Sequence, residues 1–82
     1  MSLDLNMKVK EIRELSDEEI SQLVFEARNY LRDLRFKKVT GQVEDTSQFR
    51  KTKRLIARLL TVLRERELAA EREASAQGGQ EA

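Results

Sequence analysis

Two runs of apolar residues at helical spacing, separated by one break, constrain the fold of this chain more than any other feature. The first run consists of Ile20, Val24, Ala27, Leu31 and Leu34. The second run consists of Phe49, Thr52, Ile56, Leu59 and Leu63. Steps of three and four residues place each set on one face of an α-helix, where it forms a seam that packs against a partner. No proline interrupts either run.

End signals predict the first helix at residues 16–40. Ser16 is a good N-cap, and Glu19 follows at the spacing of a capping box. Gly41 suits the left-handed conformation just beyond a helix. A turn at residues 41–45 (GQVED) then leads into a second helix at about 45–70, with Asp45 as the expected cap and Thr46 as the alternative.

The second helix meets no glycine until Gly78, and we expect its ordered end between residues 68 and 74. Residues 71–82 are small, polar and acidic, and are predicted to be a flexible tail. Residues 1–15 form a leader in which MKVKEIREL has the pattern of one or two amphipathic turns.

The predicted fold class is all-α. Two helices joined by so short a turn must run antiparallel, so residues 16–70 form a helical hairpin between the leader and the tail. In this arrangement Leu34 lies near Phe49, and Ile20 lies near Leu63.

Composition excludes several classes of function. Without cysteine or histidine the chain lacks disulfides, thiolate metal sites and the usual general base. We therefore expect no catalytic residue, no metal site, no cofactor and no enzymatic activity. The longest apolar run is far shorter than a membrane span, and MSLDLNMKVK has no secretory signal. These features predict a protein of the cytoplasm or of an organelle interior, with no membrane partner.

The charge is strongly segregated along the chain. Residues 28–66 carry twelve basic and four acidic side chains, a net charge of +8, although the whole chain carries only +1. Residues 1–27 carry three basic and seven acidic side chains, and residues 67–82 carry one and four. A basic block of this kind favours a polyanionic partner, because phosphate offsets the repulsion between neighbouring cations. Charge alone leaves a solvated face or an acidic protein surface as alternatives.

Helical spacing aligns many of these cations. Arg28, Arg32 and Arg35 share one face of the first helix. One face of the second helix carries Arg50, Arg54, Arg58 and, extending it, Thr61. The end of the hairpin at the turn is crowded by Lys37, Lys38, Lys51 and Lys53.

Six apolar residues lie outside the two seams: Phe25, Tyr30, Phe36, Leu55, Leu60 and Val62. They either widen the seam of a twisted hairpin or contact a partner on a second surface. A lone hairpin is marginal in water, so a partner that completes the fold is physically reasonable.

The segments LRFKKVTGQVED and IARLLTVLRERE resemble the bacterial large-subunit ribosomal protein family numbered twenty-nine. The pattern L-R-F/M-x-x-A-T/S-G-Q-L is matched by Leu34, Arg35, Phe36, Thr40, Gly41 and Gln42. The pattern I/V-A-R-x-x-T-V/L-L is matched by Ile56, Ala57, Arg58, Thr61, Val62 and Leu63. EIRELSDEEI is similar to the family's opening, and the likeness runs without gaps from Met7 to about Glu67. Val39, Val43, Leu55 and Leu60 depart from the usual residues.

The resemblance implies a structural protein that binds large-subunit ribosomal RNA at the rim of the polypeptide exit tunnel. It also implies a place beside ribosomal protein twenty-three, near the docking sites of trigger factor and the signal recognition particle. From the matched motifs, the expected turn and RNA residues are Arg35, Phe36, Thr40, Gly41, Gln42, Ala57, Arg58 and Thr61. Charge adds to the RNA-binding set Arg28, Arg32, Lys37, Lys38, Arg50, Lys53 and Arg54.

Two other functions are compatible with parts of this sequence. A coiled-coil interaction module explains the spacing of the seams but not the basic block. Helix-turn-helix regulators usually have three helices and a sharper turn, whereas this sequence predicts two long helices.

Overall fold

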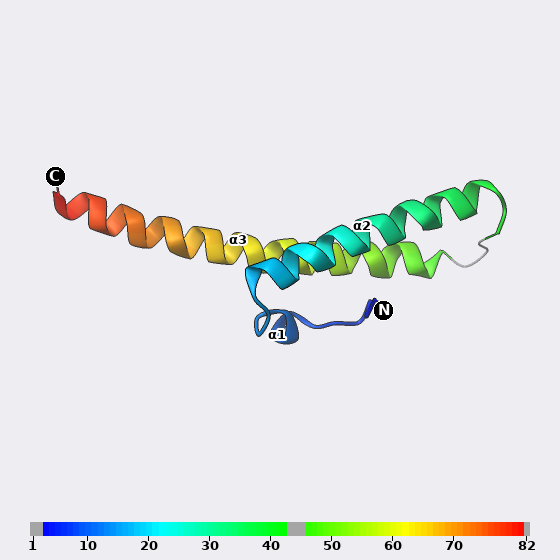
Figure 1. Ribbon diagram of the computed structural model, residues 1–82, viewed down its shortest axis with the longest axis horizontal. Coiled ribbons are helices and arrows are strands. Elements are labelled where there is room, and N and C mark those ends of the chain that lie inside the picture. Colours follow the sequence, from blue (N-terminus) through cyan, green and yellow to red (C-terminus); the bar gives the residue numbers. More distant parts are fainter. Residues whose placement is uncertain (1–2, 43–45, 82) are drawn as a thin grey trace.

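The computed structural model describes residues 3–42 and 46–81, with side chains as far as Ala74. It contains α1 (Val9–Ile12), α2 (Asp17–Val39) and α3 (Ser47–Glu81), and the described residues include no strand. In Figure 1, α2 lies beside the N-terminal part of α3, and the C-terminal part of α3 projects far beyond α2. The molecule measures 61 × 22 × 17 Å. The prediction of an all-α fold with two long packed helices and a short N-terminal segment is confirmed.

The two ends of α2 form as the sequence predicts. Ser16 Oγ accepts a hydrogen bond from the Glu19 N–H at 3.2 Å. At the other end Gly41 has φ +77°, in the left-handed region that favours glycine. The Gly41 N–H donates to the Lys38 carbonyl at 3.1 Å, and the Gln42 N–H donates to the Lys37 carbonyl at 2.8 Å. This pair of bonds is a Schellman motif, which satisfies carbonyls at the end of the helix.

The predicted cap at Asp45 lies outside the described residues. Because α3 begins at Ser47, Thr46 is the residue immediately before the helix, and its carbonyl accepts from the Phe49 N–H at 3.1 Å.

The end of α3 differs from the prediction, since the helix continues to Glu81 rather than ending between residues 68 and 74. Alanine, glutamate and arginine dominate this stretch and favour a helix, while each glycine costs only about 1 kcal/mol within one. The path of the backbone does not test the flexibility predicted for residues 71–82, which stays a prediction.

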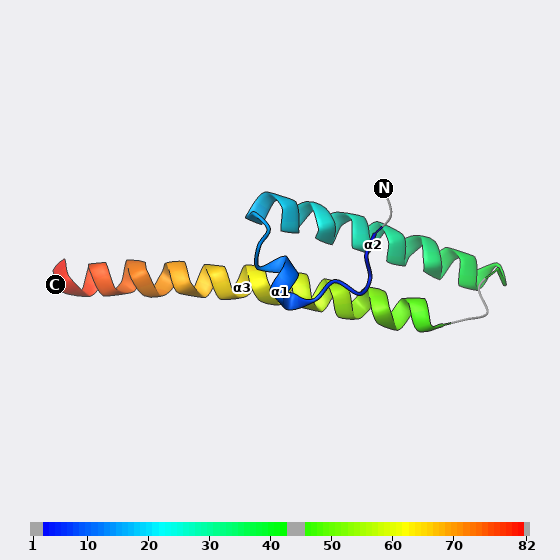
Figure 2. The same ribbon diagram turned by 90° about the horizontal axis from the view of Figure 1, so that it is seen from below.

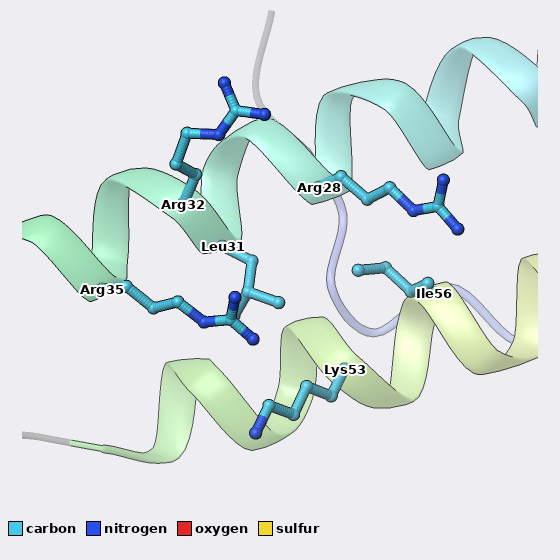
Figure 3. A pocket seen from close by; sticks show the side chains of 6 residues that line it. All are labelled: Arg28, Leu31, Arg32, Arg35, Lys53 and Ile56. Atoms are coloured by element: carbon cyan, nitrogen blue, oxygen red, sulfur yellow. The ribbon is translucent and has the colours of Figure 1, made fainter.

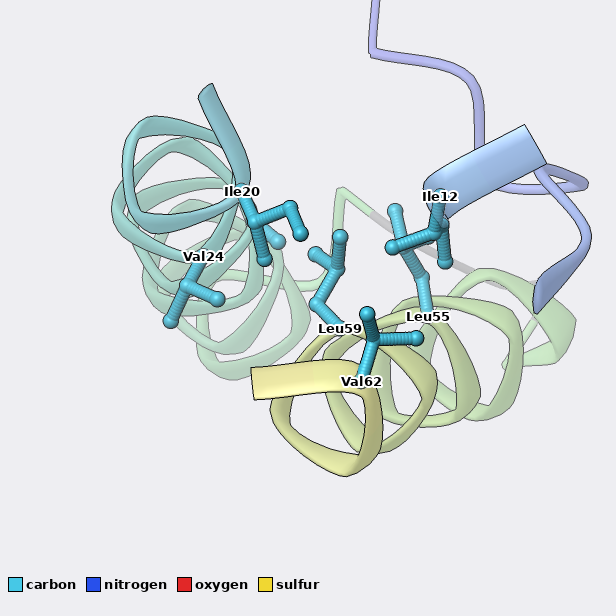
Figure 4. Packing of buried hydrophobic residues seen from close by; sticks show 7 residues of the cluster. Ile12, Ile20, Val24, Leu55, Leu59 and Val62 are labelled. Atoms are coloured by element: carbon cyan, nitrogen blue, oxygen red, sulfur yellow. The ribbon is translucent and has the colours of Figure 1, made fainter. Parts of the chain in front are cut away.

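All three helices contribute to the core. One buried cluster contains Ile12 of α1, Ile20, Val24 and Ala27 of α2, and Leu55, Leu59 and Val62 of α3. Figure 4 shows these side chains converging from the three elements. The first predicted seam is confirmed, because Leu31 and Leu34 are buried as well.

The second predicted seam is only partly correct. The buried residues of α3 are Thr52, Leu55, Leu59 and Val62, whereas Phe49, Ile56 and Leu63 are half-buried. The buried face is therefore turned toward Leu55 and Val62, each 1% exposed, and α1 covers that side with Ile12, which is 0% exposed. Figure 2 shows α1 lying across α3. A hairpin of two helices has no such third element, and this is why the sequence-based seam was misplaced.

Two arginines of α3 hold the leader in place. Arg66 forms an ion pair with Asp17 and donates to the carbonyls of Arg13 at 3.0 Å and Leu15 at 2.7 Å. Arg58 Nη1 donates to the Met7 carbonyl at 3.4 Å. Arg66 therefore joins α3 to the connection between α1 and α2, a role that was not singled out from the sequence.

Candidate nucleic-acid interface

A basic groove runs between α2 and α3, with a volume of about 450 Å³. Its cations are Arg28, Arg32, Arg35 and Lys53, and its apolar walls are Leu31 and Ile56. Figure 3 shows Arg35 pointing across the gap toward α3, whereas Arg32 points away from it. The regular spacing of the arginines along α2 and the packing of Leu31 against α3 thus place Arg28 and Arg35 along one side of the groove, opposite Ile56 and Lys53 of α3.

Among the described residues, the cations of the basic groove have no compensating partner. All four residues are exposed, and none of them forms an ion pair or hydrogen bond within the part of the chain that the structure describes. No carboxylate is among the residues that line the groove. Guanidinium groups in this position can donate two parallel hydrogen bonds to a phosphate, and the apolar walls can contact a sugar or a base.

Several of the predicted RNA-binding residues at the turn end form hydrogen bonds that end α2. Thr40 Oγ1 donates to the Lys37 carbonyl at 3.0 Å, and Gly41 and Gln42 form the Schellman motif, so the Thr-Gly-Gln motif ends α2. Lys38 Nζ lies 5.4 Å from the centre of the Phe49 ring, a cation–π contact that links the two helices at this end. Lys37 and Arg50 are exposed and can contact an anion, and Lys38 is exposed although its ammonium already lies over the Phe49 ring.

The predicted cations of α3 do not all join the groove. Lys53 is the α3 cation that lines the groove, whereas Arg50 and Arg54 lie about 120° and 160° around the helix from Ile56 of the groove wall. Arg58 is half-buried and bonded to the leader. Thr61 Oγ1 donates to the Ala57 carbonyl at 2.7 Å within the same helix.

The apolar residues predicted to lie outside the seams divide into two groups. Leu55 and Val62 are buried within the chain, so for them the wider-seam alternative is correct. Phe25 is 61% exposed, Phe36 is 68% exposed and Leu60 is 39% exposed, while Tyr30 is half-buried. Whether a partner covers the exposed group is not tested, and the second surface stays a prediction for these residues.

Two further properties bear on the kind of site present. Within residues 3–42 and 46–81, no helix has the length and apolar character needed to cross a membrane. Over the same residues, no cluster of three or more acidic side chains is arranged to hold a metal ion.

Comparison with known proteins gives one consistent family. The model of the Ribosomal L29 protein family matches residues 10–66. The large ribosomal subunit protein uL29 of Thermosipho melanesiensis is 50% identical over 66 residues, covering 80% of this chain and 100% of the relative. The uL29 protein of Geobacillus stearothermophilus is 50% identical, covering 78% of this chain and 97% of the relative. The uL29 protein of Trichodesmium erythraeum is 47% identical, covering 83% of this chain and 83% of the relative. The chain therefore belongs to the ribosomal L29 family, uL29, whose members are structural, non-enzymatic proteins of the large ribosomal subunit.

Proposed function

We propose that this protein binds ribosomal RNA of the large subunit through the basic groove and the exposed cations at the turn end. The observation that carries the proposal is a set of four cations without an ion pair among the described residues, Arg28, Arg32, Arg35 and Lys53, around one groove between the two long helices. Like charges at helical spacings of three and four residues repel each other, and an RNA phosphate offsets that repulsion while releasing counterions.

Exposed aromatic residues of α2 support the same assignment. Phe25 and Phe36 are eleven positions apart, about three helical turns, and therefore share one face with Arg32 between them. Aromatic and guanidinium groups in alternation suit the stacking of unpaired bases as well as phosphate binding. Lys37, Lys38, Arg50 and Arg54 extend the cationic surface beyond the groove.

The position on the ribosome is proposed from the family resemblance. In this proposal the protein sits at the rim of the polypeptide exit tunnel beside ribosomal protein twenty-three, and contributes to the rim at which trigger factor and the signal recognition particle dock. Its location is then the cytoplasm, or the interior of an organelle, on the ribosome. The charge segregation supports such a site, because the basic middle of the chain can face RNA while the acidic first 27 residues face away.

The coiled-coil alternative is weakened by the packing. Dimerisation through the seams requires accessible seam residues, but Ile20, Ala27 and Leu59 are each 0% exposed within the single chain. The described structure uses these surfaces internally.

A paired-variant experiment tests the RNA assignment. The double change Arg28→Gln and Arg35→Gln removes two groove cations, and the control Arg64→Gln and Arg72→Gln removes two exposed cations elsewhere on α3. Binding to large-subunit rRNA is measured over a salt series. We expect the groove variant to lower the salt slope by about 1.4–1.8, since each lost phosphate contact contributes about 0.7–0.9. Equal slopes for the two variants, or binding insensitive to salt, would reject the groove as the RNA site.

A further inference from the structure

A second groove lies on the other edge of α2, between this helix and the leader, with a volume of about 520 Å³. Its apolar floor consists of Met7 and Leu15 of the leader and Leu23 of α2. Glu18, Glu19 and Glu26 line it from α2. We call it the acidic groove.

The floor of the acidic groove is apolar surface that the fold leaves partly open. Met7, Leu15 and Leu23 pack against the core cluster from outside, yet all three are only half-buried. They gather in one concave place rather than being scattered singly over the surface. A hollow with an apolar floor and a polar border can accept apolar side chains of a partner.

The border of the acidic groove carries uncompensated negative charge. Glu26 accepts a hydrogen bond from Gln22 at 3.3 Å, but Glu18, Glu19 and Glu26 form no ion pair with any side chain that the structure describes. No lysine or arginine lines the groove. Three carboxylates repel phosphate, so this groove is unsuited to RNA and complementary to a cationic partner.

The two grooves give α2 edges of opposite charge. Glu26 and Arg28 stand on either side of buried Ala27, about 100° from it in opposite directions around the helix. The acidic edge continues through Glu19 and Leu23, and the basic edge continues through Arg32 and Arg35.

We propose that the acidic groove docks a basic amphipathic helix of another protein. Apolar side chains of that helix cover Met7, Leu15 and Leu23, and its lysines or arginines pair with the three glutamates. A helix in an apolar groove is a common mode of recognition, in which buried apolar anchors supply affinity and charge sets orientation. This inference goes beyond RNA binding, since it assigns a protein partner to the face that phosphate avoids.

The test uses the full chain and a fluorescent 18-residue helical peptide of leucine and lysine, with leucines at i, i+3, i+4 and i+7. Fluorescence anisotropy measures affinity, and methyl NMR spectra report on Met7, Leu15 and Leu23. The acidic-groove variant is Glu18→Gln, Glu19→Gln and Glu26→Gln. Its matched control, Glu67→Gln, Glu71→Gln and Glu73→Gln, removes three exposed carboxylates of α3. The capping bond survives, because Ser16 Oγ accepts from the backbone of Glu19.

The expected result is saturable binding with methyl shifts at the three floor residues. The acidic-groove variant should weaken binding of the peptide at least about tenfold, while the control changes it less than twofold. Equal weakening by both variants means general charge attraction and overturns the proposal, as does equal binding of a leucine–glutamate peptide. Self-association of the free chain that the peptide displaces would assign the groove to a second copy instead. Affinity for rRNA is measured in parallel and should be unchanged in the acidic-groove variant. Failure of the peptide-docking proposal is therefore distinguishable from failure of the RNA assignment.

A second measurement examines the assembled ribosome. A photoreactive residue placed at Gln22, in purified large subunits, should crosslink to a lysine- or arginine-rich helical peptide of a neighbouring protein. Crosslinking to rRNA, or to no protein, counts against the proposal.

Discussion

Leu55 and Ile56 are adjacent on α3, and exchanging each for alanine should have very different costs. Leu55 is 1% exposed beneath α1, whereas Ile56 is half-buried at the edge of the basic groove. In a hairpin of two helices the order would be reversed, with Ile56 at the seam. The pair therefore tests whether the short helix α1 is part of the core.

The magnitudes follow from what each change removes. Leu55→Ala deletes three buried carbon atoms at about 0.8 kcal/mol each and leaves a cavity, for a total of about 3 kcal/mol. Ile56→Ala deletes as many carbon atoms from a partly exposed site and gains a few tenths of a kcal/mol in helix propensity, for a net cost of about 1 kcal/mol. A chain of this length has a free energy of unfolding of about 4–12 kcal/mol, so both costs are measurable.

Urea unfolding of the isolated protein, followed by circular dichroism, measures both variants under the same conditions. Adding Ile12→Ala to each variant completes the test. Because Ile12 and Leu55 belong to one buried cluster, their costs should be non-additive by about 0.5 kcal/mol or more. The coupling between Ile12 and Ile56, which packs against the cluster from outside, should be smaller. Equal costs for Leu55→Ala and Ile56→Ala, or additivity between Ile12 and Leu55, would refute the packing of α1 over α3.

Three further changes probe the contacts that close the fold, each measured by urea unfolding. Arg66→Gln should lower the free energy of unfolding by about 1–2 kcal/mol, because it removes the ion pair with Asp17 and weakens the bonds to the Arg13 and Leu15 carbonyls. Arg64→Gln should lower it by less than about 0.5 kcal/mol, because the only partner of Arg64 among the described residues is the exposed Glu67. Gly41→Ala should lower the free energy of unfolding by about 1 kcal/mol through the left-handed backbone alone, since among the described residues no atom beyond the two chain neighbours lies within 4 Å of the added Cβ. Gly41→Asn should cost less, and equal costs for the two variants would argue against this reason. Ser16→Ala should cost about 1 kcal/mol by removing the cap of α2, and no loss of helix stability would mean that the Ser16–Glu19 bond contributes nothing in solution.

The sequence by itself determined the parts of this protein that depend on neighbouring residues. The Ser16 cap, the left-handed Gly41 and the apolar periodicity of residues 20–34 are local features, and each forms in the structure as predicted. The aligned arginines of α2 are local in the same sense, because helical spacing alone places Arg28, Arg32 and Arg35 along one edge.

Only the tertiary structure decided which half of the apolar stripe on α3 is buried. Leu55, Ile56, Leu59, Val62 and Leu63 make a stripe wide enough for either choice, and periodicity cannot distinguish its two edges. The choice depends on α1, which is a single helical turn far from α3 in the sequence. Its contribution to the core comes from one fully buried side chain, Ile12. A turn that short has no periodicity to detect, and its stability comes from the packing itself. The same packing forms the acidic groove beside the leader. It also brings Arg58 and Arg66 within hydrogen-bond distance of carbonyls of the leader, so these two arginines hold the leader on α3.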